Sequence, residues 1–264
     1  MTTLSTGRDT ALAAAAATLA GAVSLAVLVV VALHSSRGQR WDASAMNTVV
    51  GGRDTQLTVL SVLGYVSIGA IVIVVVGCAL VALLRGRVQL ALAAAVVIAG
   101  ANLTTQVLKH VILDRPDLGN GTLNSLPSGH TTVVASSVGA ALLVAPRVTR
   151  PFLAAAGGFA ITLTGASTVV AGWHRPSDVL AALAVSLVWT AGVAFFVHGP
   201  ARSVAGTFIG ALAGCAGALF FLVAVGVRPV LGWDGFIQAG LVLGGLAAAT
   251  GLFVLAASAV SPAE

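Results

Sequence analysis

The sequence predicts an all-α, polytopic membrane protein with about eight transmembrane helices. The first observation is composition: 58% of the 264 residues are hydrophobic, only 8% are charged, and the mean hydropathy is +1.04. A soluble domain averages about 25% charged residues, so this chain cannot cover a water-facing surface. The second observation is that apolar runs long enough to cross about 30 Å of hydrocarbon recur along the whole chain.

Each predicted span is an apolar run bounded by charged or turn-forming residues. The spans cover residues 10–34, 56–84, 90–112, 129–146, 151–171, 179–198, 204–226 and 236–259. The first run is too long for a signal peptide and lacks a small-residue cleavage site, so we expect it to remain as an anchor. The largest polar gap, residues 35–55, is too short for a soluble domain. We therefore expect a single membrane domain.

The net charge of +5 is spread over short clusters between the apolar runs. This pattern is typical of basic residues that flank membrane helices, and it excludes a nucleic-acid-binding patch. Cys78 and Cys215 both lie inside apolar runs and form no disulfide or zinc pattern. Eight spans place both termini on one side. Once the basic cluster described below is set aside, the remaining Lys and Arg favour a cytoplasmic side for the termini in the cell membrane.

Chemically active residues gather in two loops on the opposite, extracytoplasmic side. The loop after the third span contains Lys109, the only lysine of the chain, followed by Arg115-Pro116 and by Pro127-Ser128-Gly129-His130. The loop after the fifth span runs from Ser167-Thr168 to His174-Arg175-Pro176-Ser177-Asp178. A chain this poor in charge has concentrated its charge in these two loops, which are the candidate site.

The first loop has the features of a phosphate-binding site. Pro127-Ser128-Gly129 predicts a turn that opens a helix, with Ser128 near the N-cap and free backbone N–H groups beside it. A helix N-terminus of this kind favours an anion such as phosphate. Lys109 and Arg115 add positive charge, and the arginine can donate two hydrogen bonds to phosphoryl oxygens.

The second loop has the features of an activated histidine. His174 precedes Asp178 by four residues, and Pro176 suits the first position of the next helix. A carboxylate one turn away can hold one imidazole nitrogen as N–H and leave the other to attack or to accept a proton. His130 and His174 could then act as nucleophile and general acid around one phosphate. The competing interpretation is lipid-headgroup anchoring, which suffices for His34, His110 and His198.

At these residues the sequence resembles the type 2 phosphatidic acid phosphatase (PAP2) superfamily, which also includes the vanadium haloperoxidases. The motifs of that family are Lys-x6-Arg-Pro, Pro-Ser-Gly-His and Ser-Arg-x5-His-x3-Asp, and the second is intact here. The resemblance covers about residues 56–198. It leaves residues 1–55 as an N-terminal helix with an outer loop, and residues 199–264 as a hairpin added to a six-helix core.

The resemblance implies a mechanism without metal or cofactor. His174 would be the nucleophile that forms a phosphohistidine, Asp178 would orient it, and His130 would protonate the leaving alcohol. The phosphoryl group would be bound by Lys109, Arg115, Ser128 and the Gly129 N–H.

Two departures from the family pattern affect this expectation. Five residues rather than six separate Lys109 from Arg115, which on a helix rotates one side chain by about 100° relative to the other. In the third motif Thr168 stands where the family has arginine, so one phosphate-binding guanidinium is missing. Arg175, directly after His174, is the candidate replacement.

We therefore expect a membrane phosphatase acting on a lipid phosphate or diphosphate, either polyprenyl or phosphatidic-acid-like. The alternatives are phosphoryl transfer to an acceptor other than water, and a non-catalytic lipid-binding or transport protein with a degenerate site. Glycines at four-residue intervals in the last two spans predict close helix packing, either within the terminal hairpin or across a homodimer. These are Gly206, Gly210, Gly214, Gly240 and Gly244.

Overall fold

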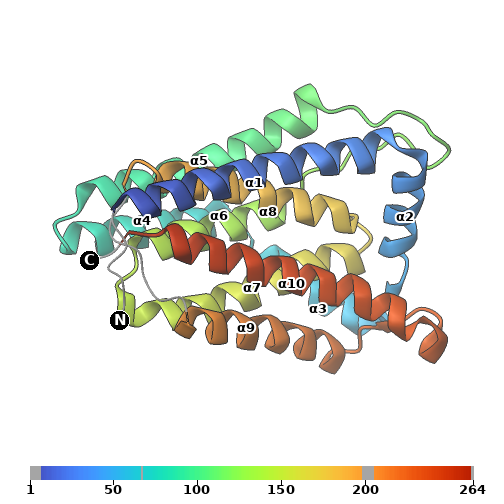
Figure 1. The fold of residues 1–264 in the computed structure, drawn as a ribbon. Coiled ribbons are helices and arrows are strands. Elements are labelled where there is room, and N and C mark those ends of the chain that lie inside the picture. Colours follow the sequence, from blue (N-terminus) through green and yellow to red (C-terminus); the bar gives the residue numbers. More distant parts are fainter. Residues whose placement is uncertain (1–6, 67, 198–204, 263–264) are drawn as a thin grey trace.

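The protein is a bundle of helices that run along a common axis (Figure 1). The computed structural model describes residues 7–66, 68–197 and 205–262. The first helix begins and the last helix ends at the same end of the bundle, while α2 lies across the opposite end. This arrangement places the two described chain ends on one side.

Nearly all regular structure in the described residues is helical. The α-helices are α1 (Gly7–His34), α2 (Ser36–Met46), α3 (Arg53–Gly64), α4 (Ile68–Leu84), α5 (Val88–Val107), α6 (Gly129–Val144), α7 (Arg150–Val170), α8 (Pro176–Ala194), α9 (Ala205–Ala224) and α10 (Phe236–Val260). Short elements join them: a π-helical turn (Leu108–Ile112), 3-10 turns (Arg147–Thr149 and Gly232–Gly235), and the strands β1 (Val49–Val50) and β2 (Arg228–Pro229).

The predicted all-α membrane fold is confirmed, with a difference in the number of full spans. Within the described residues, six helices are long and apolar enough to cross a membrane, and the pair α3–α4 makes a seventh if it counts as one span. That pair is bent by 47°. The bend follows Gly64, a residue that lowers helix propensity by about 1 kcal/mol. The remaining predicted span, α6, has 16 residues and rises about 24 Å, less than the hydrocarbon thickness.

The polar gap at residues 35–55 is more structured than a loop. Ser35 caps α2 by accepting a hydrogen bond from the Gly38 N–H at 3.2 Å. Next along the chain, β1 pairs antiparallel with β2. The hydroxyl of Thr55 donates to the Val225 carbonyl at 2.7 Å. These contacts join the α1–α3 connection to the α9–α10 connection at the end of the bundle opposite the termini.

Small and polar residues hold the central helices together. From α5, the Asn102 amide donates to Ser136 Oγ at 3.2 Å, and the Thr105 hydroxyl lies 2.9 Å from that of Thr132. Within a bilayer, apolar surface gives helices little reason to associate, so such contacts favour their packing. They fix α6 against α5, and the N-terminus of α6 carries part of the candidate site.

The glycines of α9 pack against α7, not against α10. A Cβ on Gly210 would lie 2.2 Å from the Pro151 carbonyl oxygen, and one on Gly214 would lie 2.0 Å from that of Ala155. In α10, Gly240 and Gly244 have no heavy atom within 4 Å of such a Cβ. The expectation of a glycine-packed terminal hairpin is therefore wrong for α9, because its small residues allow contact with the α7 backbone instead.

Candidate active site

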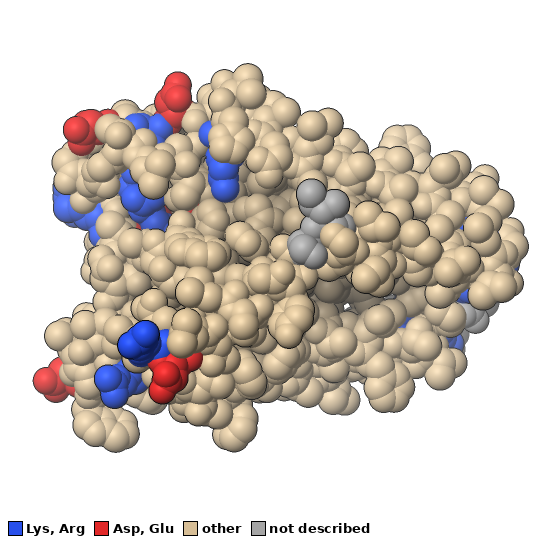
Figure 2. All heavy atoms as spheres, turned by 180° about the vertical axis from the view of Figure 1, so that it is seen from behind, with Lys and Arg blue, Asp and Glu red and all other residues tan. Residues whose placement is uncertain are grey.

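Charged side chains lie at the two ends of the molecule, and more of them lie at one end than at the other. Figure 2 shows the face opposite to that of Figure 1, with blue and red side chains concentrated at the end that carries α2, and an uncharged middle section. An uncharged girdle is what lipid contact requires, because a charge in hydrocarbon costs several kcal/mol. The loop of residues 113–128 and the α7–α8 connection both lie at this charged end.

The α7–α8 connection is a tight turn that sets the backbone of His174. Beyond the last residue of α7, Gly172 adopts a positive φ of 71°, a conformation that favours glycine. The N–H groups of Trp173 and His174 both donate to the Thr168 carbonyl, at 3.0 and 3.2 Å. Helix α8 then starts at Pro176, which occupies the first helical position as predicted.

His174 and Asp178 are hydrogen-bonded and buried. The imidazole Nδ1 lies 3.1 Å from Asp178 Oδ2, and the two side chains are 9% and 2% exposed. The same carboxylate oxygen accepts hydrogen bonds from Ser125 Oγ at 2.6 Å and from the Arg175 N–H at 2.9 Å. Because Nδ1 faces the carboxylate, Nε2 is the nitrogen left for chemistry.

The N-terminus of α6 lies against this pair. Ser128 is the N-cap residue, as predicted, and its Oγ accepts hydrogen bonds from the N–H and the hydroxyl of Thr131 at 3.4 and 3.1 Å. Its own N–H donates to the Asp178 carbonyl at 2.9 Å. The Ser128 side chain is thus engaged in capping, which leaves the first-turn N–H groups after it, beginning at Gly129, as the anion donors.

His130, in the first turn of α6, faces the second loop. Its ring lies 5.7 Å from that of Trp173, centroid to centroid. It interacts electrostatically with both His174 and Lys109, and Lys109 in turn interacts with Asp178. The structure therefore brings the two histidines, the lysine and the aspartate of the prediction into one site.

The shortened spacing between Lys109 and Arg115 is accommodated by the backbone. Lys109 lies in the π-helical turn, where the Leu113 N–H donates to the Leu108 carbonyl five residues earlier. Such a turn winds fewer degrees per residue than an α-helix. The helix ends at Ile112, so Arg115 sits on the following loop. The 100° rotation expected on a continuous helix does not apply.

Both candidate arginines are anchored by carbonyl groups, and each has a buried nitrogen without a hydrogen-bond partner among the described residues. Arg115 is 5% exposed and donates to the carbonyls of Gly121 and Ala32, while its Nη2 has no partner. The Nη1 of Arg175 donates to Ser125 Oγ at 3.2 Å and to the Leu123 carbonyl at 3.4 Å, and its Nε is buried without a partner. Each guanidinium thus retains a donor for an oxyanion.

Thr168 cannot supply the missing guanidinium. It is fully buried, and its hydroxyl donates to the Gly165 carbonyl within α7 at 2.7 Å. The side chain of Arg175 is linked to the pair through Ser125, whose hydroxyl accepts from Arg175 and donates to Asp178. Whether Arg175 replaces the family arginine stays a prediction.

The sequence analysis did not identify four residues that build the site, which are Asn124, Ser125, Asp42 and Ser177. Asn124 donates to the carbonyls of Lys109 and Leu113, which ties the loop to the end of α5. Ser125 links Arg175 to Asp178. Asp42 on α2 accepts two hydrogen bonds from Ser177. The only sequence signal for Asp42 is that it is one of just eight acidic residues.

Comparison with known proteins gives one match. The family model described as the PAP2 superfamily matches residues 90–200. All eight predicted site residues, from Lys109 to Asp178, lie inside this segment. No curated protein and no solved structure matches the chain.

Proposed function

Over residues 90–200 this chain belongs to the PAP2 superfamily, and on that premise we propose that it is a membrane phosphatase that hydrolyses a lipid phosphate or diphosphate through a phosphohistidine. Superfamily membership and the multiple apolar helices support a phosphatase-type function in a membrane. The observation that carries the finer proposal is the buried hydrogen bond between His174 Nδ1 and Asp178 Oδ2, at 3.1 Å.

The proposed reaction has two steps that use these residues. With Nδ1–H donating to Asp178, His174 Nε2 attacks phosphorus, the ester P–O bond breaks, and His130 gives its proton to the leaving alcohol. Water then attacks the phosphohistidine. The P–N bond breaks, His130 takes a proton from the water, and phosphate leaves. Lys109, Arg115 and the first-turn N–H groups of α6 stabilise the charge on the phosphoryl oxygens.

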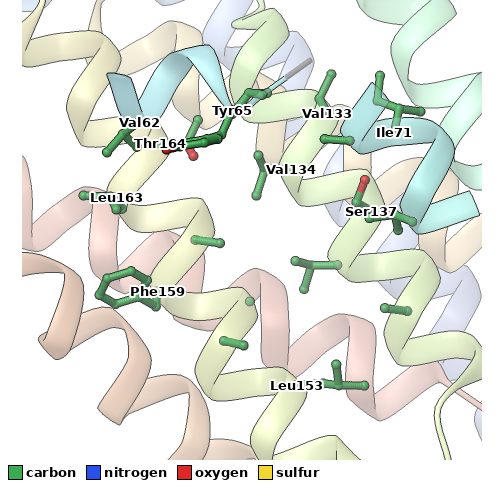
Figure 3. A pocket seen from close by; sticks show the side chains of 18 residues that line it. Val62, Tyr65, Ile71, Val133, Val134, Ser137, Leu153, Phe159, Leu163 and Thr164 are labelled. Carbon is green, nitrogen blue, oxygen red and sulfur yellow. The ribbon is translucent and has the colours of Figure 1, made fainter. Parts of the chain in front are cut away.

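A lipid rather than a soluble phosphate is supported by an apolar pocket beside the site. This tail pocket has a volume of about 500 Å³ and lies between the α3–α4 pair, α6 and α7 (Figure 3). Its lining includes Val62, Val133, Val134, Phe159 and Leu163. Val133 follows His130 by three residues on α6, so the pocket begins about one helical turn from the site. Its size and apolar lining suit a hydrocarbon chain whose phosphate lies at His130.

Phosphate release by the purified protein tests the proposal directly. Micelles would carry phosphatidic acid, a polyprenyl phosphate or a polyprenyl diphosphate, each with and without a chelator, and His174→Ala would serve as the blank. We expect chelator-resistant release from at least one lipid. No release from any of them would overturn the phosphatase proposal.

A bulky residue at the far end of the tail pocket tests the lipid assignment. Ala156 lines the pocket two helical turns away from Thr164, at the end distant from the site. Ala156→Trp should raise KM for a long-chain substrate by about tenfold and leave a short-chain, water-soluble analogue unaffected. The matched control is Ala216→Trp, in an apolar groove of about 440 Å³ between α9 and α10. Equal effects of both variants would contradict a tail site.

A further inference from the structure

Asp42 is a buried carboxylate that lies outside the family segment and contacts the candidate site. It belongs to α2 and is 9% exposed. Its Oδ1 accepts a hydrogen bond from the Ser177 N–H at 3.0 Å, and its Oδ2 accepts one from the Ser177 hydroxyl. The two residues are 135 positions apart in the sequence.

This contact replaces a cap that α8 cannot make for itself. The N-cap position of α8 is Arg175, whose side chain has no acceptor for the free N–H groups of the first turn. Asp178 reaches back to the Arg175 N–H, and Asp42 takes the Ser177 N–H. A carboxylate at a helix N-terminus is also favoured by the helix dipole. The first turn of α8 is therefore positioned by a different element of the chain.

Charge and burial indicate that this arrangement does more than stabilise the fold. Burial raises the pKa of Asp42, so its desolvation outweighs the hydrogen bonds that favour the charged form. Asp42 also interacts with the charges of Asp178 and Arg175. A buried charge is weak evidence for stability, and replacing one with an uncharged residue is often neutral or favourable. The presence of the Asp42 carboxylate is better explained by its contact with Ser177, which holds the first turn of α8 in place.

Ser177 is adjacent to Asp178 and three residues after His174. A shift in the first turn of α8 would move the Asp178 carboxylate relative to the imidazole. Lys109 and Arg115, which are proposed to bind phosphate, come from the end of α5 and the following loop. Disturbing α8 should therefore affect the chemical step more than substrate binding.

We infer that Asp42 is a positioning residue, whose hydrogen bonds to Ser177 hold the first turn of α8 so that Asp178 orients His174. The inference rests on the proposed function. It assigns a role in the reaction to the N-terminal α1–β1 connection, outside residues 90–200.

Steady-state kinetics of three variants test it. Asp42→Ala removes both hydrogen bonds and should lower kcat about 10²-fold with little change in KM, since small misplacements of reacting groups cost about this much. Ser177→Ala retains the N–H bond, and Asp42→Asn retains an acceptor for it. Both variants should keep more kcat than Asp42→Ala.

A control that removes a buried hydrogen bond elsewhere separates positioning from stability. Thr55→Val removes the Thr55–Val225 hydrogen bond at the same end of the molecule, away from α8, and should leave kcat unchanged. An equal loss of kcat in Thr55→Val, or a loss confined to KM, would overturn the inference. If Asp42→Ala does not fold, full kcat in both milder variants overturns it. Wild-type protein that releases no phosphate would instead contradict the proposed function.

Discussion

At the scale of single residues, Asp178 connects the parts of the site. Its Oδ2 accepts hydrogen bonds from the Ser125 hydroxyl and the Arg175 N–H and lies 3.1 Å from His174 Nδ1, while its carbonyl accepts one from Ser128. These contacts join α8, α6 and the loop of residues 113–128. They fix the position of the carboxylate, so that it can orient the imidazole through Nδ1.

The two histidines should differ in how much activity depends on them. His174→Ala removes the proposed nucleophile and should abolish phosphate release, while His130→Ala removes the proposed general acid and should lower kcat about 10²–10⁴-fold. The measurement is phosphate release per folded protein. His110→Ala, at an exposed position beside Lys109, is the control and should retain activity. Near-normal turnover in His174→Ala would eliminate the phosphohistidine mechanism.

Arg175 should act on the charge that develops at the phosphoryl group. Its buried Nε has no hydrogen-bond partner among the described residues, so the residue that follows His174 in the chain retains a donor. We expect Arg175→Ala to lower kcat about 10²-fold, and Arg175→Lys to restore only part of that, because an ammonium cannot form the two-pronged contact. Unchanged kcat in both variants would show that Arg175 only holds the loop, through Ser125 and Leu123.

At the scale of elements, α2 closes the charged end of the bundle and reaches the first turn of α8. Gln39, fully buried on α2, donates to the carbonyls of Leu33 and Pro116, and so connects α1 to the loop that carries Arg115. Together with Asp42, it makes α2 part of the wall of the site. We therefore expect substitutions in α2 to affect catalysis as well as folding.

The Asp42 carboxyl predicts a particular dependence of stability on pH. Because its pKa is raised in the folded state, its contribution to stability is present below the ordinary aspartate pKa of 3.8 and is lost as pH rises through the folded-state pKa. Asp42→Asn cannot ionise at this position and therefore keeps its stability as pH rises. The unfolding temperature of Asp42→Asn minus that of wild type should therefore increase from pH 4 to pH 8. Thermal unfolding in detergent across this range measures the difference.

The control for that measurement is Asp54→Asn, at an exposed position near the start of α3. Its unfolding temperature gives the effect of replacing an exposed carboxylate and is subtracted from that of Asp42→Asn. A difference between Asp42→Asn and wild type that is constant with pH would contradict the burial argument. Higher stability combined with lower kcat in Asp42→Asn would distinguish positioning from structural support.

At the scale of the whole molecule, the charged end and the uncharged middle section determine how the protein is oriented in a membrane. The site lies at the end opposite the termini (Figure 1). We predict that the termini lie in the cytoplasm, which would make the site face outward. The phosphate of the proposed lipid substrate would then lie at the outer interface, with its chain along the tail pocket.

Thiol labelling tests this orientation. Asn120→Cys, in the loop at the site end, should react with a membrane-impermeant reagent in intact cells, whereas Thr149→Cys, at the opposite end, should react only after permeabilisation. Both native cysteines are buried, which keeps background labelling low. The reverse pattern would place the site in the cytoplasm.

The sequence by itself was sufficient for features that depend on local chemistry. Apolar length identified the membrane helices, and Ser128 and Pro176 marked two helix starts, because capping and proline preferences act within one turn. The four-residue spacing of His174 and Asp178 predicted their contact, and the structure places His174 in the turn just before α8 and Asp178 in the first turn of that helix. The bend after Gly64 was not predicted, because glycine inside an apolar run is also compatible with a straight helix.

Only the tertiary structure decided which distant segments meet. The Asp42–Ser177 contact spans 135 residues and the Thr55–Val225 contact 170, and no periodicity encodes such partners. The α9 glycines permit close approach without specifying the helix that approaches, and the structure shows that it is α7. Local patterns reveal what a segment can form and which face is small or polar, whereas partner choice depends on how all the helices fill one volume together.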